Sequence, residues 1–250
     1  MHINFQDKVV VVTGSSRGIG AAIAEMFYRS DAKVALLDLN GEECEKRARD
    51  MDKSGKNILA VQADVADENQ VREAVGRIMN LFRRIDILVN NAGILHHLPI
   101  EEKTVADFER VMKVNLTGAF IMCKYTIPIM KKQGKGKIVN ISSLGARTGR
   151  PKVGVDYAAS KAGMIALTQT LAREVGPFGI YVNAIAPGPI LTDLTRAVPQ
   201  EIFATWNAGR AINKNGLPED IANAAIFLAS EMSDWITGIT LDVNGGIFIS

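Results

Sequence analysis

Residues 8–20 read KVVVVTGSSRGIG, and this stretch decides the fold. Its continuous apolar, β-branched run is typical of a strand that is buried on both faces. A turn with Gly14, Gly18 and Gly20 follows and opens a helix. The glycines let the backbone turn tightly and approach a pyrophosphate, while the helix N-terminus supplies N–H donors. The spacing is G-x-x-x-G-x-G, which differs from the G-x-G-x-x-G fingerprint of dinucleotide sites. The prediction of a dinucleotide site therefore depends on the position of the turn directly after the first strand.

Similar strand-like runs recur along the chain. They read KVALLDL, NILAVQAD, IDILVNNAG, GKIVNIS, IYVNAIAPG and ITLDVNGG. Helix-length segments lie between the strands, at residues 19–30, 41–54, 68–82, 105–132, 157–175 and 218–230. Strands that alternate with helices predict βαβ units with right-handed crossovers. The expected fold class is α/β, a single doubly wound Rossmann-type domain over residues 1–250 with a parallel sheet of about seven strands flanked by helices.

Composition excludes several classes of function. The 250 residues include 29 basic and 27 acidic side chains, a net charge of +2, which gives no electrostatic basis for binding nucleic acid. Cys44 and Cys123 are far apart and show no metal-ligand spacing, so we expect reduced thiols and no metal site. No apolar run reaches the roughly 18 residues of a membrane span, and the N-terminus lacks signal-peptide architecture. We therefore expect a cytoplasmic protein.

An acidic residue at the end of the second predicted strand bears on the choice of coenzyme. Asp38 follows the glycine-rich turn by about twenty residues, where a carboxylate can accept hydrogen bonds from an adenosine ribose and would repel a 2′-phosphate. This favours NAD over NADP. Arg17 argues the other way, because it could receive that phosphate, unless it forms an ion pair with Asp38. Asp64 ends the third strand and either contacts the adenine or caps the strand.

The sequence YAASK at residues 157–161 places a tyrosine and a lysine on one helix face. A phenol ordinarily has a pKa near ~10 and a lysine near ~10.4. A fixed ammonium beside the phenol would lower the pKa of Tyr157, which would let it act as a general acid or base. The alternative is an incidental pair on a surface helix.

With TGSSRGIG, NNAG and YAASK in this order, the chain resembles the short-chain dehydrogenase/reductase family over essentially its whole length. The matching motifs are Thr13–Gly20, ADV at 63–65, NNAG at 90–93, Asn115, SS at 142–143, Tyr157-x-x-x-Lys161 and PGPILT at 187–192. It is most similar to the 3-oxoacyl-[acyl-carrier-protein] reductase and hydroxysteroid dehydrogenase branches. The resemblance implies an NAD-dependent oxidoreductase that interconverts a secondary alcohol and a ketone.

The resemblance also implies four catalytic residues. Tyr157 would exchange the proton at the substrate oxygen, and Lys161 would keep the tyrosine acidic and hold the nicotinamide ribose. Ser143 would polarise the substrate oxygen, with Ser142 as the rival for this role. The carboxamide of Asn115 would hold a water that links Lys161 to solvent, or the residue merely marks a helix irregularity.

The cofactor contacts implied by the resemblance form a larger set. Ile19 would cover the pyrophosphate turn, Asn90 and Gly93 would border the adenosine ribose, and Thr192 would bind the nicotinamide carboxamide. The full set is Gly14, Ser16, Arg17, Gly18, Ile19, Gly20, Asp38, Leu39, Asp64, Val65, Asn91, Ala92, Gly93, Tyr157, Lys161, Pro187, Gly188, Ile190 and Thr192.

The substrate pocket is expected between residues 95–98, 144–155 and 188–216, the last a mobile excursion over the site. Candidate lining residues are His96, His97, Leu144, Arg147, Val153, Leu191, Leu194, Ile202, Phe203 and Trp206. The two histidines contact the substrate or lie on the loop surface. A basic run could meet an acidic carrier protein or a coenzyme A phosphate, or it is a solvated helix end. This run comprises Lys131, Lys132, Lys135 and Lys137, with Arg173 on the next helix.

Three functions stay open from the sequence. The first is oxidoreduction of a 3-oxoacyl thioester or of a cyclic, polyol or steroid-like alcohol. The second is a catalytically silent nucleotide-binding subunit, and the third is lyase or epimerase chemistry. The presence of all four expected catalytic residues favours the first. By resemblance, helices 105–132 and 157–175 would pack against partner subunits in a homotetramer.

Overall fold

A computed structural model describes residues 3–150, 153–196 and 198–249, with the side chains of residues 193 and 194 left undescribed. The strands are β1 (Val9–Thr13), β2 (Lys33–Asp38), β3 (Ile58–Gln62), β4 (Ile87–Asn90), β5 (Gly136–Ile141), β6 (Ile180–Pro187) and β7 (Thr240–Val243). They form one parallel sheet in the order β3-β2-β1-β4-β5-β6-β7. The predicted seven-stranded α/β fold is confirmed.

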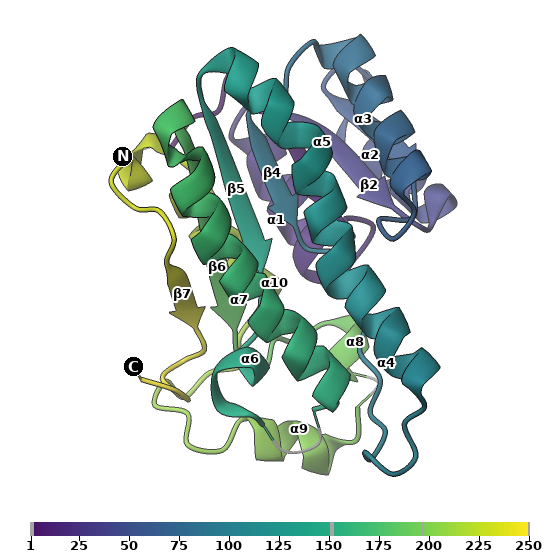
Figure 1. Cartoon of the computed structure of the whole chain (residues 1–250), viewed down its shortest axis with the longest axis vertical. Helices are drawn as coiled ribbons and strands as arrows, with labels where there is room; N and C mark the ends of the chain where they lie inside the picture. The colour runs from purple at the N-terminus through teal and green to yellow at the C-terminus, as the bar shows by residue number, and fades with distance from the viewer. Residues whose placement is uncertain (1–2, 151–152, 197, 250) are drawn as a thin grey trace.

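Helices cover both faces of the sheet (Figure 1). The longer ones are α1 (Gly18–Arg29), α2 (Gly41–Met51), α3 (Glu68–Phe82), α4 (Val105–Met112), α5 (Gly118–Gln133), α7 (Val155–Val175) and α10 (Pro218–Ala229). The shorter ones are η1 (Lys113–Thr117), α6 (Gly145–Thr148), η2 (Gly176–Phe178), α8 (Asp193–Arg196), α9 (Gln200–Trp206) and η3 (Glu231–Ser233). One apolar core packs α1, α2 and α10 against the sheet, and a second packs α3, α5 and α7 against its other face. This double burial explains why the strands are apolar throughout.

The sequence located most helices correctly and misjudged some of their ends. The helix predicted at residues 41–54 ends at Met51, because the Asp52 carboxylate accepts the backbone amides of Ser54 and Asn57 and starts a turn. The helix predicted at 105–132 is not uniform, since the π-helical turn η1 separates α4 from α5.

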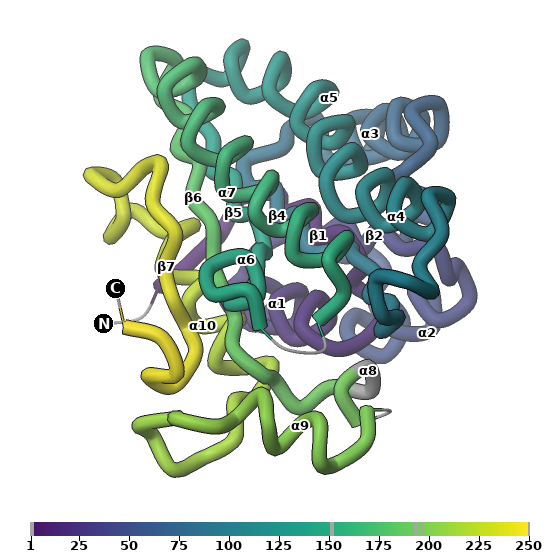
Figure 2. The backbone as a smooth tube through the Cα atoms, turned by 60° about the horizontal axis from the view of Figure 1, so that its bottom comes forward, coloured from purple at the N-terminus to yellow at the C-terminus, as the bar shows by residue number. Residues whose placement is uncertain are grey.

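The segment 188–216 was expected to be a long loop, and that expectation is wrong in part because it contains α8 and α9. Hydroxyl groups stabilise the start of α8, where Thr195 Oγ1 accepts the Thr192 amide and donates to the carbonyl of Ile190. The carboxyl ends of β5 and β6 point toward α6, α8 and α9, and Figure 2 shows these short helices gathered with the start of α7 at that end of the molecule. This end is where parallel sheets bind their ligands.

Candidate active site

The turn between β1 and α1 depends on glycines, two of which have a positive φ. Gly14 has a φ of +63°, and a Cβ on it would lie 2.8 Å from the Cα of Ala92. Gly18 has a φ of +59° and opens α1, and a Cβ there would meet the side chain of Thr192 at 3.6 Å. The turn therefore exposes backbone to a ligand, and the fold brings Thr192 beside it. This cradle suits the pyrophosphate of a dinucleotide.

The segment NNAG after β4 holds this turn in place. Thr13 Oγ1 accepts the amides of Asn91 and Ala92 at 3.0 Å, and Asn91 Nδ2 donates to the carbonyls of Thr13 and Gly14. The Asn91 side chain thus braces the turn. The Asn90 side chain is buried and donates to Asn140 Oδ1 at 2.8 Å, so only its backbone is placed to border an adenosine ribose.

Asp38 lies at the tip of β2 with both carboxylate oxygens fixed by backbone amides. Its Oδ2 accepts the Ser16 amide at 2.9 Å, and its Oδ1 accepts the Asn40 amide at 3.0 Å. Across the described part of the chain, no ion pair joins Arg17 to Asp38. The sequence reasoning missed Arg47, whose Nε donates to the carbonyl of Ser16 at 2.7 Å. Only the packing of α2 brings Arg47 to the turn, and nothing in the local sequence indicated this.

Three further residues that were expected to contact the cofactor differ in how accessible they are. Asp64 Oδ1 accepts the amide of Ala66 at 2.8 Å, which is the strand-end cap predicted as the alternative to an adenine contact. Leu39 is exposed at the carboxyl edge of the sheet. Val65 is buried, and a Cβ on Gly118 would lie 2.8 Å from its Cγ2. Leu39 is therefore the accessible apolar surface of this group.

The two serines that follow β5 point to different partners. The Ser143 hydroxyl lies close enough to the Tyr157 phenol to lower its pKa, and it accepts the Gly145 amide at 3.0 Å. The Ser142 hydroxyl is buried and donates to the Lys161 carbonyl at 2.8 Å, which ties α7 to the end of β5. The geometry therefore places Ser143, and not Ser142, beside the phenol.

Lys161 is buried below Tyr157. Its Nζ donates to the carbonyl of Ile141 at 2.7 Å and lies 5.8 Å from the centroid of the Tyr157 ring. A Cβ on Gly93 would lie 3.4 Å from this nitrogen and 3.2 Å from Asn115 Oδ1. The fold thus gathers these residues of four separate segments around one point.

Asn115 lies in the π-helical turn η1, which confirms the predicted helix irregularity. Its Oδ1 accepts the Ile94 amide at 2.8 Å, and its Nδ2 donates to the Ile94 carbonyl at 3.0 Å and to Ser160 Oγ at 3.1 Å. Both amide hydrogens are therefore committed to the chain. This leaves the carboxamide no free hydrogen for the expected water relay.

Burial dominates the protonation of the tyrosine and the lysine. It raises the pKa of Tyr157, while the hydrogen bond with Ser143 lowers it. It lowers the pKa of Lys161 from 10.5 to about 8. The prediction that the Lys161 ammonium brings the pKa of Tyr157 below its ordinary value is therefore wrong, because burial of the phenol itself raises this pKa.

The expected substrate-pocket residues come from three segments. The rings of His97 and Trp206 are 5.2 Å apart, and those of Phe203 and Trp206 are 6.5 Å apart. Arg150 donates to the carbonyl of Trp206, which joins the loop after α6 to α9. Leu144 is buried, and Ile202 and Leu191 are half-buried. The side chain of Leu194 lies outside the described residues.

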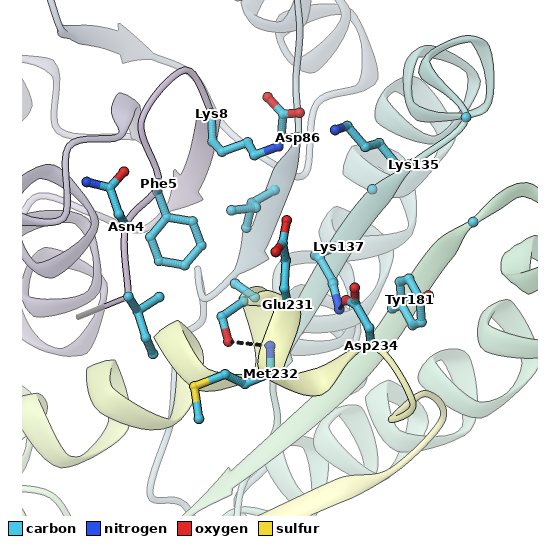
Figure 3. Close-up of a pocket in the computed structure, with 17 residues that line it drawn as sticks. Asn4, Phe5, Lys8, Asp86, Lys135, Lys137, Tyr181, Glu231, Met232 and Asp234 are labelled. Carbon is cyan, nitrogen blue, oxygen red and sulfur yellow. Dashed lines mark hydrogen bonds and ion pairs between the residues drawn. The ribbon is translucent and has the colours of Figure 1, made fainter. Parts of the chain in front are cut away.

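The basic run lies at the opposite end of the sheet from Ser143 and Tyr157. A cavity of about 460 Å³ there is lined by the amino ends of strands and includes Lys8 and Lys135 (Figure 3). Lys137 pairs with Asp234 at 2.6 Å and lies 3.9 Å from the centroid of the Tyr181 ring. Lys137 is thus engaged within the fold rather than free for a carrier protein.

The described residues contain no group of three histidine, cysteine or acidic side chains that could hold a metal ion. None of the helices in the described ranges has the length and hydropathy that a membrane span requires.

Comparisons with known proteins agree with this architecture. Residues 14–248 match the family model described as enoyl-(acyl carrier protein) reductase. The chain is 41% identical over 250 residues to the 3-oxoacyl-[acyl-carrier-protein] reductase FabG of Aquifex aeolicus (strain VF5), covering 99% of this chain and 100% of that protein. It is 37% identical over 247 residues to the FabG of Chlamydia pneumoniae, covering 99% of each chain.

A crystal structure from Brucella melitensis, described as a short-chain dehydrogenase/reductase SDR:glucose/ribitol dehydrogenase, superposes with a TM-score of 0.94 at 33% identity over 100% of both chains. The doubly wound sheet and these matches define an oxidoreductase that uses a nicotinamide cofactor. The chain belongs to the short-chain dehydrogenase/reductase family.

Proposed function

We propose that this protein reversibly interconverts a ketone and a secondary alcohol with NAD(H), and that its substrate is a 3-oxoacyl thioester. The observation that carries the proposal is the cluster of Ser143, Tyr157 and Lys161 at the carboxyl end of β5, at the same end of the parallel sheet as the glycine-rich turn. Hydride chemistry needs only one proton from the protein, and a buried phenol beside a hydroxyl can supply it.

In the reductive direction, Ser143 donates a hydrogen bond to the substrate carbonyl oxygen, and Tyr157 transfers its proton to that oxygen. A nicotinamide held by Lys161 and Thr192 would supply the hydride for the carbonyl carbon. Lys161 then stabilises the phenolate that Tyr157 becomes, because its ammonium is fixed by the Ile141 carbonyl and desolvated with the phenol. In the oxidative direction the same phenolate accepts the proton of the alcohol.

The chain's own residues account for coenzyme binding and for the preference for NAD. The turn from Gly14 to Gly20 holds the pyrophosphate, Lys161 and Thr192 hold the nicotinamide half, and Asp38 accepts the ribose hydroxyls of the adenosine. Because Asp38 is held by the Ser16 and Asn40 amides, it cannot swing away from a 2′-phosphate. Arg17 and Arg47 lie at the same turn and oppose this preference by attracting that phosphate.

The substrate class rests on the named relatives. Those with the highest identity quoted above are 3-oxoacyl-[acyl-carrier-protein] reductases, which supports a thioester. The similar structure from Brucella melitensis is described as a glucose/ribitol dehydrogenase, which supports a polyol as the second candidate.

The test follows NADH and NADPH oxidation with a 3-oxoacyl thioester, and NAD reduction with ribitol and glucose in parallel. Turnover of the thioester with NADH supports the proposal. Tyr157→Phe should abolish turnover, whereas Tyr125→Phe should keep it, because the hydrogen bond that Tyr125 makes among the described residues goes to the exposed Glu68. Turnover of the polyols alone transfers the proposal to the second candidate. Coenzyme binding with no turnover of any of these substrates would contradict it and favour a silent subunit.

We further propose a homotetramer, as expected from the family. Val105, Phe108 and Phe120 are exposed on α4 and α5, which supports burial of these helices against another copy. Light scattering of the purified protein tests this proposal, and a monomer would contradict it.

A further inference from the structure

A buried ion pair joins the loop before α4 to the first turn of α7, directly beside Tyr157. Lys103 Nζ lies 2.7 Å from Asp156 Oδ2, and the two side chains are 2% and 0% exposed. Desolvating two charges is costly, and a well-packed apolar pair would fill the same space without that cost. Stability alone therefore does not explain why charges occupy this position.

The contacts of the pair connect two parts of the active site. Lys103 Nζ also lies 3.4 Å from the carbonyl oxygen of His96, in the segment expected to border the substrate. Asp156 Oδ1 accepts the backbone amide of Tyr157 at 2.8 Å. An uninterrupted path of polar contacts thus runs from the loop at His96 to the backbone of Tyr157.

The residue at the start of α7 shows how tightly this path is packed. Gly154 precedes the helix with a φ of −57° and a ψ of 139°, which any residue can adopt. A Cβ on it would overlap Asp156 Oδ1 and lie 2.5 Å from the His96 carbonyl oxygen. Glycine is needed here for space rather than for conformational freedom. The backbone, the carboxylate and the loop carbonyl are therefore held in contact.

We propose that Lys103 and Asp156 are positioning residues that hold the first turn of α7, and with it the Tyr157 phenol, against the substrate loop. This inference rests on the proposed role of Tyr157. Gly154 provides no side-chain cap for α7, so the Asp156 carboxylate satisfies a free amide at the positive end of the helix. Lys103 locks that carboxylate in place and neutralises it.

A substitution in the pair would change the charge near Tyr157. Among the described residues, the Ser143 hydroxyl and the Lys161 ammonium also lie against this side chain. Removing Lys103 leaves the Asp156 charge uncompensated and should raise the pKa of Tyr157. Removing the Asp156 charge leaves the Lys103 ammonium and should lower it.

The experiment compares Lys103→Met, Asp156→Asn and the double variant, together with one control substitution. A single variant should lower kcat by about 10- to 100-fold, because a displaced catalytic group is very costly. The coenzyme dissociation constant should change by no more than about twofold, since neither residue belongs to the proposed coenzyme site. The control Lys46→Met removes the same type of side chain from an exposed pair with Asp50 on α2, outside the helices proposed to meet another copy, and should leave kcat unchanged.

The pH profile and the double variant separate positioning from simple stabilisation. For reduction, the alkaline limb of kcat should move up in pH in Lys103→Met and down in Asp156→Asn. The double variant holds no unpaired buried charge, so its Tm should recover, while kcat stays low. If kcat recovers together with Tm, or if the folded single variants keep full kcat, the pair is only structural and the proposal is overturned.

Hydrogen exchange keeps this test separate from that of the proposed function. If the unaltered protein turns over none of the carbonyl substrates, the proposed function fails on its own. The positioning role is then decided by hydrogen exchange of the Tyr157 amide. Faster exchange in Lys103→Met that is confined to the start of α7 and the loop at His96 would support this role. Unchanged exchange there would overturn it.

Discussion

The buried ammonium of Lys161 should impose a pH-dependent penalty on folding that its removal relieves. The test replaces Lys161 with methionine in a chain that already carries Tyr157→Phe, so that the phenol cannot titrate in either protein. Lys161 is 3% exposed, and burial lowers its pKa from 10.5 to about 8. Its only recorded hydrogen bond to the described chain is that to the Ile141 carbonyl.

The magnitude follows from linkage between protonation and folding. The difference between 10.5 and about 8, at about 1.36 kcal/mol per pH unit, corresponds to a penalty of about 3 kcal/mol. Folding lowers this pKa, so the native state disfavours the charged amine. The penalty is complete below pH 8, where both states carry the charge, and disappears above pH 10.5, where neither does. Between pH 7 and pH 9.5 it should fall by about 2 kcal/mol.

The assay is urea unfolding of Tyr157→Phe and of Tyr157→Phe with Lys161→Met at both pH values. The free energy of unfolding of the lysine-containing protein should rise by about 2 kcal/mol relative to the methionine protein as the pH increases. All other titrating groups are shared, so their contributions cancel. A difference that stays constant between pH 7 and pH 9.5 would refute the reasoning, since it would mean that water reaches the amine.

Further substitutions test the coenzyme site and the serine assignment. Asp38→Asn should raise the ratio of kcat/KM with NADPH to kcat/KM with NADH by about tenfold or more. The substitution removes a fixed negative charge that would face the 2′-phosphate of NADPH. An unchanged ratio would contradict the NAD preference. Gly14→Ala should lower the free energy of unfolding by clearly more than Gly55→Ala. Both glycines have a positive φ, but only the new Cβ at position 14 would also clash with Ala92. Equal losses of the free energy of unfolding in urea would refute this close approach. Ser143→Ala should lower kcat by about 100-fold with little change in Tm. Ser142→Ala should mainly lower Tm, because its hydroxyl bonds to the Lys161 carbonyl. The reverse pattern would exchange the roles of the two serines.

The alternation of strands and helices was predictable because each element is specified locally. The valine run before Gly14 needs no distant residue to identify it as a buried strand. Asp67 caps α3 through the amides of Asn69 and Gln70, and the start of that helix was placed correctly. Helix ends and the short helices after β6 were harder to place, since packing rather than local pattern determines them.

Some candidate site residues could be named from spacing alone. Tyr157 and Lys161 share a helix face because they are four residues apart, whatever surrounds them. The glycine-rich turn was identifiable because it follows a strand and opens a helix. The effect of Lys161 on the phenol was not predictable, because burial of both groups depends on segments remote in the chain.

The sequence by itself determined the fold class, the position of the glycine-rich turn and the family, since all three depend on local patterns of residues. Only the tertiary structure decided that Ser143 rather than Ser142 meets Tyr157, that Arg47 reaches the Ser16 carbonyl, and that Lys103 pairs with Asp156 across 53 positions of the chain. Such contacts depend on how separate elements pack, and the environment that sets a pKa is created only when the chain has closed around the group.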